Sequence, residues 1–205
     1  LIRQLQQRGW PVLVDEAHGS HFAAGVDPNL PPSAVESGAD LVVHSLQKSA
    51  TGLAQTAVLW LQGPRVDPDA IERSICWLQT TSPSALLLAS CEAALEQWQQ
   101  PDGRRKLESR LMEGRKLAED LRRDGLPLLP SQDPLRLVLH TGAAGISGLE
   151  ADQWLLKRGL AAELPEPATL TFCLGLNRQQ GLRRQLRNCW QALLRHHPGR
   201  PPQPA

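Results

Sequence analysis

The chain has 205 residues, of which 41% are hydrophobic and 21% charged, so it is long and apolar enough to bury a sizeable core. Its formal charge of +1 gives no reason to expect nucleic acid or an acidic membrane as a partner, and no run approaches the ~20 apolar residues of a membrane span. The four cysteines include no CxxC pair, and no HxxxH or HExxH spacing occurs, so we expect neither a metal site nor a disulfide scaffold. A globular, cytoplasmic protein follows as the expectation.

The first hundred residues alternate between helical and strand patterns. Residues 1–9 predict a helix that ends at Gly9, and the apolar residues 11–14 predict a strand that stops at Asp15. A loop rich in Pro and Gly and a short helix follow, and the next strands are predicted at residues 39–43 and 56–61. Apolar strands that each end in polar residues, with helices or loops between them, predict a mostly parallel sheet covered on both faces. The short helix is predicted at residues 33–37.

Beyond Gly63 the pattern becomes helical and then returns to a smaller α/β arrangement. The break at Pro101–Gly103 predicts a boundary between a sheet domain at 1–100 and a small C-terminal α/β domain at 101–197. Residues 198–205 are rich in Pro and are predicted to be disordered. The predicted helices lie at 67–79, 84–99, 104–123, 148–158 and 179–196, and the predicted strands at 135–140 and 170–174. The tryptophans in these patterns are expected in the core: Trp60, Trp77, Trp98, Trp154 and Trp190.

Polar side chains follow the first two predicted strands, at 15–21 and at 44–48. Ligands of an open α/β sheet gather at the carboxyl ends of its strands, so the two clusters could face one pocket. A lysine just past a buried strand, here Lys48, can be partly desolvated, which frees its amine to form a Schiff base. A neighbouring aspartate, here Asp15, can keep a pyridinium nitrogen protonated, and the Ser45 hydroxyl could bind a phosphate. Spacing alone favours the simpler interpretation, in which these residues and the nearby histidines are ordinary polar residues at strand ends.

Several segments in order resemble the Orn/Lys/Arg decarboxylase family, whose members are pyridoxal-phosphate enzymes of fold-type I. The segments are VDEAHGSHF at 14–22, GADLVVHSLQKSATGLAQTAVL at 38–59, QTTSPSALLLAS at 79–90 and SGLEADQWLLKRGLAAEL at 147–164. The resemblance implies part of a mostly parallel sheet domain of the pyridoxal-phosphate-dependent transferase type, followed by a smaller C-terminal α/β domain. It also implies that Lys48 forms the Schiff base with pyridoxal 5'-phosphate, that Asp15 pairs with the ring nitrogen, that Ser45 contacts the phosphate and that His18 lies beside the cofactor.

The same resemblance implies an assembly and a reaction. In a homodimer or larger oligomer, the TTSPS segment would approach the neighbouring subunit's cofactor, which makes Thr81 and Ser82 further contact residues. The implied reaction is decarboxylation of lysine, ornithine or arginine to the amine, a step of polyamine biosynthesis. An acidic residue would hold the substrate's cationic tail, and Glu163 and Glu166 are the candidates.

Two departures from the family pattern stand out. The chain has Gln47 where the family commonly has His before its lysine, and this removes a titratable group from the site. It starts at Leu1, without the N-terminal half of the sheet domain that carries the family's phosphate loop. We therefore expect the isolated chain to be inactive or very weak as a decarboxylase.

Two other functions are consistent with parts of the sequence. An aminotransferase-like remnant could serve as a catalytically inactive dimerisation or regulatory subunit, and Gln47 favours it. The string DEAH at 15–18, with SAT at 49–51, also resembles helicase motifs. A helicase needs a GxxxxGK[ST] phosphate loop and arginine-rich late motifs, and the sequence contains neither.

Overall fold

The computed structural model describes residues 1–197, 201, 202 and 204, and the chain divides into two compact units, residues 1–108 and 109–205. The division falls within helix α5 (Pro101–Arg123), whose first turn contains the Pro101–Gly103 segment predicted to be a break. The helix is interrupted instead just before it, at residues 98–100. Most of the tail predicted to be disordered, residues 198–200, 203 and 205, lies outside the described residues. No helix in the described part of the chain is long and apolar enough to cross a membrane.

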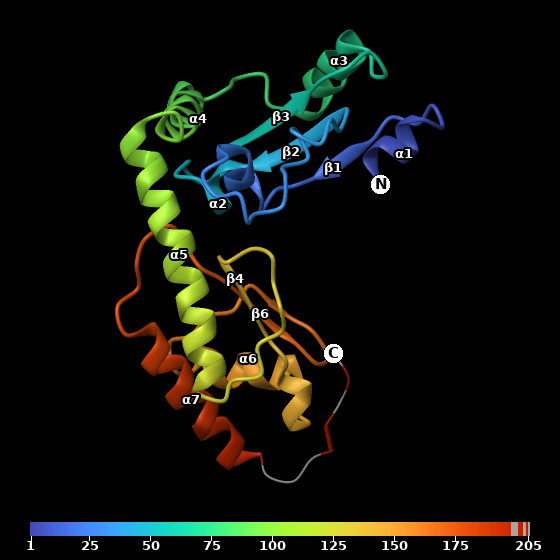
Figure 1. Ribbon diagram of the computed structural model, residues 1–205. Coiled ribbons are helices and arrows are strands. Elements are labelled where there is room, and N and C mark those ends of the chain that lie inside the picture. The colour runs from blue at the N-terminus through green and yellow to red at the C-terminus, as the bar shows by residue number, and fades with distance from the viewer. Residues whose placement is uncertain (198–200, 203, 205) are drawn as a thin grey trace. The chain divides into compact units, whose positions relative to one another are not determined.

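Unit 1 is built on a three-stranded sheet in the order β1-β2-β3, with β2 in the centre (Figure 1). Strands β1 (Leu13–Asp15) and β2 (Leu41–Ser45) are parallel, and β3 (Ala57–Leu61) runs antiparallel to β2. The expected mostly parallel pairing therefore holds for one of the two strand pairs here. The connection from β2 to β3 spans only residues 46–56, whereas a parallel return needs a crossover of about a dozen residues or more. The chain therefore turns back and β3 runs antiparallel to β2.

The central strand is buried on both faces, whereas the outer strands are partly exposed. Val42 of β2 is fully buried with Ala34 and Ala39, and Val14 and Trp60 pack against this cluster. On the outer strands, Leu13 and Leu59 are exposed. Burial of apolar area around β2 is what fixes its register against both neighbours.

Asp40, just before β2, ties the sheet to the start of the chain. Its buried carboxylate accepts hydrogen bonds from Gln6 Nε2 at 3.0 Å, from the Val12 backbone N–H at 2.9 Å and from Arg65 Nη1 at 3.1 Å. Burial by itself raises the pKa of Asp40, but these donors outweigh it, so the pKa lies below its ordinary value.

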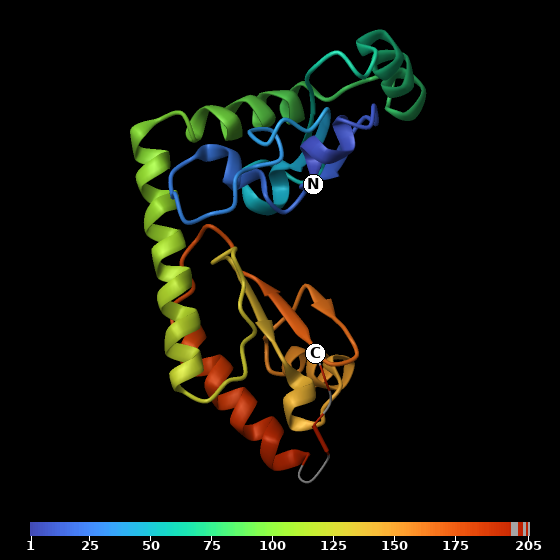
Figure 2. The same cartoon turned by 45° about the vertical axis from the view of Figure 1, so that its right-hand side comes forward.

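The helices of unit 1 are α1 (Ile2–Gln6), α2 (Leu46–Ser49), α3 (Pro68–Leu78) and α4 (Ala85–Gln97), with the 3-10 turn η1 (Ser20–Ala24). Figure 2 shows α4 alongside the strands, and Leu95 and Trp98 line a small cavity together with Trp60 of β3. The short helix predicted at 33–37 is a turn. Trp98 is buried as predicted, but Trp77 on α3 is 87% exposed, so its predicted place in the core is wrong.

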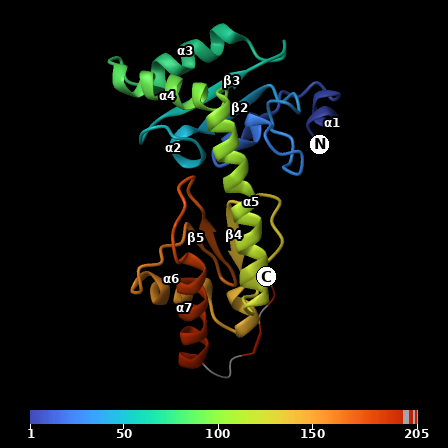
Figure 3. The ribbon, with the colours of Figure 1, turned by 60° about the vertical axis from the view of Figure 1, so that its left-hand side comes forward.

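Unit 2 is a small α/β unit whose sheet has the antiparallel order β4-β6-β5, with α6 against β5 and β6 (Figure 3). The predicted α/β character of this part is confirmed, although the two-residue strand β5 was not predicted. The elements are β4 (Arg136–Leu139), the 3-10 turn η2 (Thr141–Ala144), α6 (Gly148–Leu156), β5 (Leu164–Pro165), β6 (Leu170–Cys173) and α7 (Leu182–His196). Arg183 of α7 holds Asp124, just past α5, by two hydrogen bonds of 2.7 and 2.8 Å, which keep the pKa of Asp124 below its ordinary value.

Candidate functional site

Lys48 lies on α2, the single helical turn that follows the central strand β2. Leu46 of the same turn is fully buried, and the Ser49 hydroxyl lies 2.6 Å from the Ser20 hydroxyl of η1. A Cβ at Gly52 would lie 2.3 Å from Thr56 Oγ1 and 2.9 Å from Leu46 Cβ, so the loop after α2 can pack this closely only with glycine. Because the turn is fixed from these sides, the exposed Lys48 side chain starts from a defined position.

Asp15 is the last residue of β1, opposite Val43 of β2 in the parallel register. One of its carboxylate oxygens accepts the Ala17 N–H at 3.0 Å, a local bond that orients an otherwise exposed carboxylate. The Ala17 carbonyl in turn accepts the N–H of Ser45, the last residue of β2, at 3.3 Å. The structure thus brings the ends of β1 and β2 together, as the sequence predicts for adjacent parallel strands.

His18 and Lys48 meet across the two strand ends. Lys48 Nζ lies 3.2 Å from His18 Nε2, so an amine and an imidazole share one hydrogen bond. Ser45 is nearly buried, and within the described residues its side chain makes no capping bond to α2. Three of the five residues predicted to contact the cofactor besides Lys48 therefore come from two short segments, 15–18 and 45–48.

Gln47, the departure from the family pattern, has a structural partner. Its side-chain oxygen accepts the backbone N–H of Gln55, the one described non-glycine residue with a positive φ, at 76°. A left-handed conformation is unfavourable for a side chain such as Gln, so this bond helps to hold the loop between α2 and β3.

The other predicted contact residues are distant from Lys48 in the sequence, and the hydrogen bonds described below join them to residues close to them in the chain. Thr81 and Ser82 lie in the exposed loop between α3 and α4, where the Ser82 N–H and hydroxyl both bond to Thr80 Oγ1 at 3.3 Å. In unit 2, the Glu166 carboxylate accepts the Thr169 hydroxyl at 2.7 Å, so it already has a partner within its own loop.

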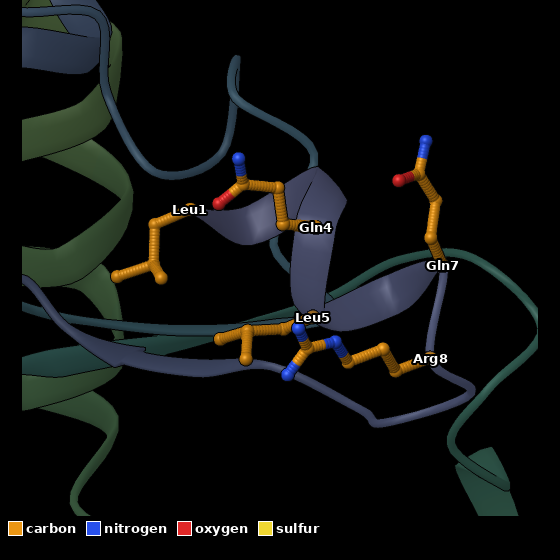
Figure 4. Close-up of a pocket in the computed structure, with 5 residues that line it drawn as sticks. All are labelled: Leu1, Gln4, Leu5, Gln7 and Arg8. Atoms are coloured by element: carbon orange, nitrogen blue, oxygen red, sulfur yellow. The ribbon is translucent and has the colours of Figure 1, made fainter.

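Two pockets of the structure have linings that do not include Lys48. One, of about 350 Å³, lies at α1 and the residues that flank it, and is lined by Leu1, Gln4, Leu5, Gln7 and Arg8 (Figure 4). Another, of about 260 Å³, has Trp60, Trp98 and Leu95 in its wall. Arg8 is the single ionisable side chain in the lining of the first pocket, which offers no pair of groups for acid–base chemistry. In the described residues, no group of three or more His, Cys, Asp or Glu side chains could hold a metal ion.

Sequence reasoning missed Glu16, which lies next to Asp15. Its carboxylate is 2.7 Å from Nε2 of the buried His44, and His44 was considered only as one of several polar residues after β2. The pattern of apolar residues carries no signal for such a pair, because the bond joins residues 28 positions apart.

Comparison with solved structures defines the class of the fold. The constitutive lysine decarboxylase of E. coli superposes with a TM-score of 0.71 at 15% identity, over 89% of this chain and 32% of that chain. A serine palmitoyltransferase of Sphingomonas wittichii superposes with a TM-score of 0.63 at 18% identity, over 95% and 50%. The predicted α/β fold of the fold-type I transferase kind is thereby confirmed.

Sequence comparison identifies the family. The major domain of the Orn/Lys/Arg decarboxylases matches residues 1–130, and the arginine decarboxylase of Bacillus subtilis (strain 168) is 31% identical over 156 residues. That alignment covers 71% of this chain and 31% of the relative. The chain belongs to the Orn/Lys/Arg decarboxylase family. It spans about a third of the length of the curated relatives that it matches.

Proposed function

We propose that this chain carries the lysine and aspartate of a pyridoxal-phosphate-dependent decarboxylase that acts on arginine, lysine or ornithine. The observation that supports the proposal is the juxtaposition of two strand ends. One presents the carboxylate of Asp15, and the other leads into the exposed amine of Lys48, both within the matched residues 1–130. The positions of Asp15 and Lys48 after their strands are informative because the chain belongs to this family, whereas the same positions alone would not be.

The residues present fit pyridoxal 5'-phosphate by their chemistry. Lys48 would hold the cofactor through its aldehyde, Asp15 would hold its ring nitrogen protonated, and the Ser45 hydroxyl would donate to its phosphate. When bound, the cofactor ring accepts the electron pair that is released as carbon dioxide leaves the substrate. Asp15 suits its role because its carboxylate accepts the Ala17 N–H, which favours one direction of the carboxylate.

His18 has a further role in this proposal. Its Nε2 lies 3.2 Å from Lys48 Nζ and is therefore placed to accept a proton from the ammonium group. Loss of that proton gives the neutral amine, which is the form that attacks an aldehyde. We assign His18 to proton transfer at Nζ, in addition to lying beside the cofactor.

The proposed enzyme is a cytoplasmic homodimer or larger oligomer. The loop with Thr81 and Ser82 is flanked by large apolar side chains that are more than half exposed, and such a patch suits a protein partner. These side chains are Trp77, Leu78, Leu86 and Leu88. The four cysteines are free thiols, which suits a reducing compartment.

A second candidate function is that of a non-catalytic subunit of the same fold. The bond from Gln55 to Gln47 favours it, because position 47 serves the loop rather than the reaction. The helicase alternative has no comparable support, since its DEAH string lies inside the segment matched by the decarboxylase family.

Titration with pyridoxal 5'-phosphate tests the first function against the second. We expect saturable binding with the visible absorbance band of a lysine-bound cofactor, loss of that band in Lys48→Ala, and weaker binding in Asp15→Asn. Lys106→Ala is the matched control, because Lys106 is an exposed lysine of the same unit. Wild-type protein that binds no cofactor, or a Lys48→Ala variant that keeps the band, would support the non-catalytic subunit.

A further inference from the structure

A chain of hydrogen bonds passes from β3 through β2 to the residue that follows β1. The Trp60 indole Nε1–H donates to His44 Nδ1 at 2.9 Å, and His44 Nε2 lies 2.7 Å from Glu16 Oε2. The other carboxylate oxygen, Glu16 Oε1, accepts the Ala34 backbone N–H at 3.0 Å. We call these three side chains, Trp60, His44 and Glu16, the relay. The His44 side chain is 2% exposed and that of Glu16 is 12% exposed.

The donors and acceptors of the relay allow one arrangement of protons. An indole N–H can only donate, so His44 Nδ1 must be the acceptor and carries no proton. The imidazole proton is then on Nε2, which donates to Glu16. Both oxygens of Glu16 accept from N–H groups, as the oxygens of a carboxylate do. His44 is therefore held as one neutral tautomer between a fixed donor and a fixed acceptor.

The relay lies directly beside the candidate site. Glu16 follows Asp15 in the chain, and the Glu16 N–H donates to the Val43 carbonyl at 3.0 Å, which extends the β1–β2 pairing by one residue. With its side chain held at both oxygens and its N–H bonded to β2, residue 16 has little freedom to rotate. Residue 16 lies between Asp15 and Ala17, and the hydrogen bond from the Ala17 N–H to the Asp15 carboxylate orients that carboxylate.

We propose that Trp60, His44 and Glu16 form a positioning relay that fixes the direction of the Asp15 carboxylate. The role toward the cofactor rests on the function proposed above. None of the three is assigned a contact with cofactor or substrate, so they act through Asp15 and are positioning residues. The relay gives the end of β1 a rigidity that the single bond from Ala17 to Asp15 does not supply.

The protonation pattern can be tested in the chain without cofactor. The ¹⁵N NMR spectrum is expected to show a His44 ring with a protonated Nε2 and an unprotonated Nδ1 at neutral pH. Trp60→Phe keeps an aromatic ring but removes the N–H that donates to His44 Nδ1. Because Glu16 still accepts from Nε2, the proton should stay on Nε2, and the ¹⁵N signal of the unprotonated Nδ1 should shift as that nitrogen loses its hydrogen bond. A wild-type His44 that carries its proton on Nδ1, or that exchanges freely between tautomers, contradicts the relay.

The positioning role is tested with Glu16→Gln. The amide must place its NH₂ group toward either the Ala34 N–H or the His44 Nε2–H, so two donors meet. We expect the Ala17 and Ser45 amides to exchange roughly tenfold faster, the factor that corresponds to a lost hydrogen bond to a charged group. Val42 amide exchange should change much less, which separates local loosening from unfolding of the unit.

Cofactor binding distinguishes this inference from the proposed function. The matched control is Glu36→Gln, because Glu36 also accepts a backbone N–H, from Ser33 at 3.3 Å, but has no bond to the relay. We expect Glu16→Gln and Trp60→Phe, but not the control, to weaken pyridoxal 5'-phosphate binding about tenfold. The positioning role is overturned if the wild-type protein binds the cofactor and both relay variants keep the wild-type affinity and the wild-type rate of Ala17 amide exchange. Wild-type protein that binds no cofactor overturns the proposed function, and with it the relay's role toward the cofactor, whatever the tautomer of His44.

Discussion

Removal of the Asp40 carboxylate should destabilise unit 1 more than removal of any exposed acid. Asp40→Ala keeps the backbone bonds of residue 40 but deletes the acceptor for Gln6, Val12 and Arg65. Gln6 and Arg65 are partly exposed and can bond to water, so most of the cost comes from the buried Val12 N–H. An unsatisfied buried donor costs ~1–3 kcal/mol, and with the smaller losses at Gln6 and Arg65 added we expect about 3 kcal/mol.

Hydrogen exchange measures this loss unit by unit. About 3 kcal/mol corresponds to roughly a hundredfold faster exchange of the β2 amides, which exchange when unit 1 unfolds. The α7 amides of unit 2 serve as an internal control. Glu72→Ala, which removes an exposed acid of the same unit, should change β2 exchange by less than about 0.5 kcal/mol. Asp40→Ala with β2 exchange as slow as in wild type would refute the argument that Asp40 holds the sheet to the start of the chain.

Three further outcomes are expected. Because the pKa of Asp40 is depressed, its contribution to stability is fully present above pH 3.8 and is lost as the pH falls through the lowered pKa. The difference in the free energy of unfolding between wild type and Asp40→Ala should therefore narrow in acid, and a constant difference contradicts this. Gly52→Ala should lower the melting temperature through a clash worth about 1–3 kcal/mol and disturb the α2 amides, and an unchanged melt would show that the loop has room. Ser147→Ala removes the capping box that Ser147 forms with Glu150 at the start of α6, and should cost about 1 kcal/mol in denaturant unfolding. Ser109→Ala, at an exposed serine inside α5 of the same unit, should cost less.

Local sequence patterns predicted the elements that depend on local rules. The continuous apolar run at 39–43 predicted β2, which is buried along most of its length, and the helical pattern at 148–158 predicted α6. The antiparallel direction of β3 was not predicted, because it depends on how residues 46–56 turn rather than on the strand itself. Trp77 was expected in the core because apolar residues recur at helical spacing around it, but α3 contains no buried residue.

The candidate site divides in the same way. Asp15 and Lys48 could be named from sequence because each follows a strand, and their roles remain predictions. The approach of His18 to Lys48 depends on the turn after β1, and the Glu16–His44 pair depends on the register of two strands. Such contacts arise from tertiary structure, which residue spacing does not encode.

Reductive trapping tests the central claim most directly. The chain is incubated with pyridoxal 5'-phosphate, reduced with borohydride, digested and mapped by mass spectrometry. The account predicts that the phosphopyridoxyl group is on Lys48, with little on Lys106, Lys116 or Lys157. Even labelling of all four lysines, or a label elsewhere with Lys48 unmodified, would contradict it.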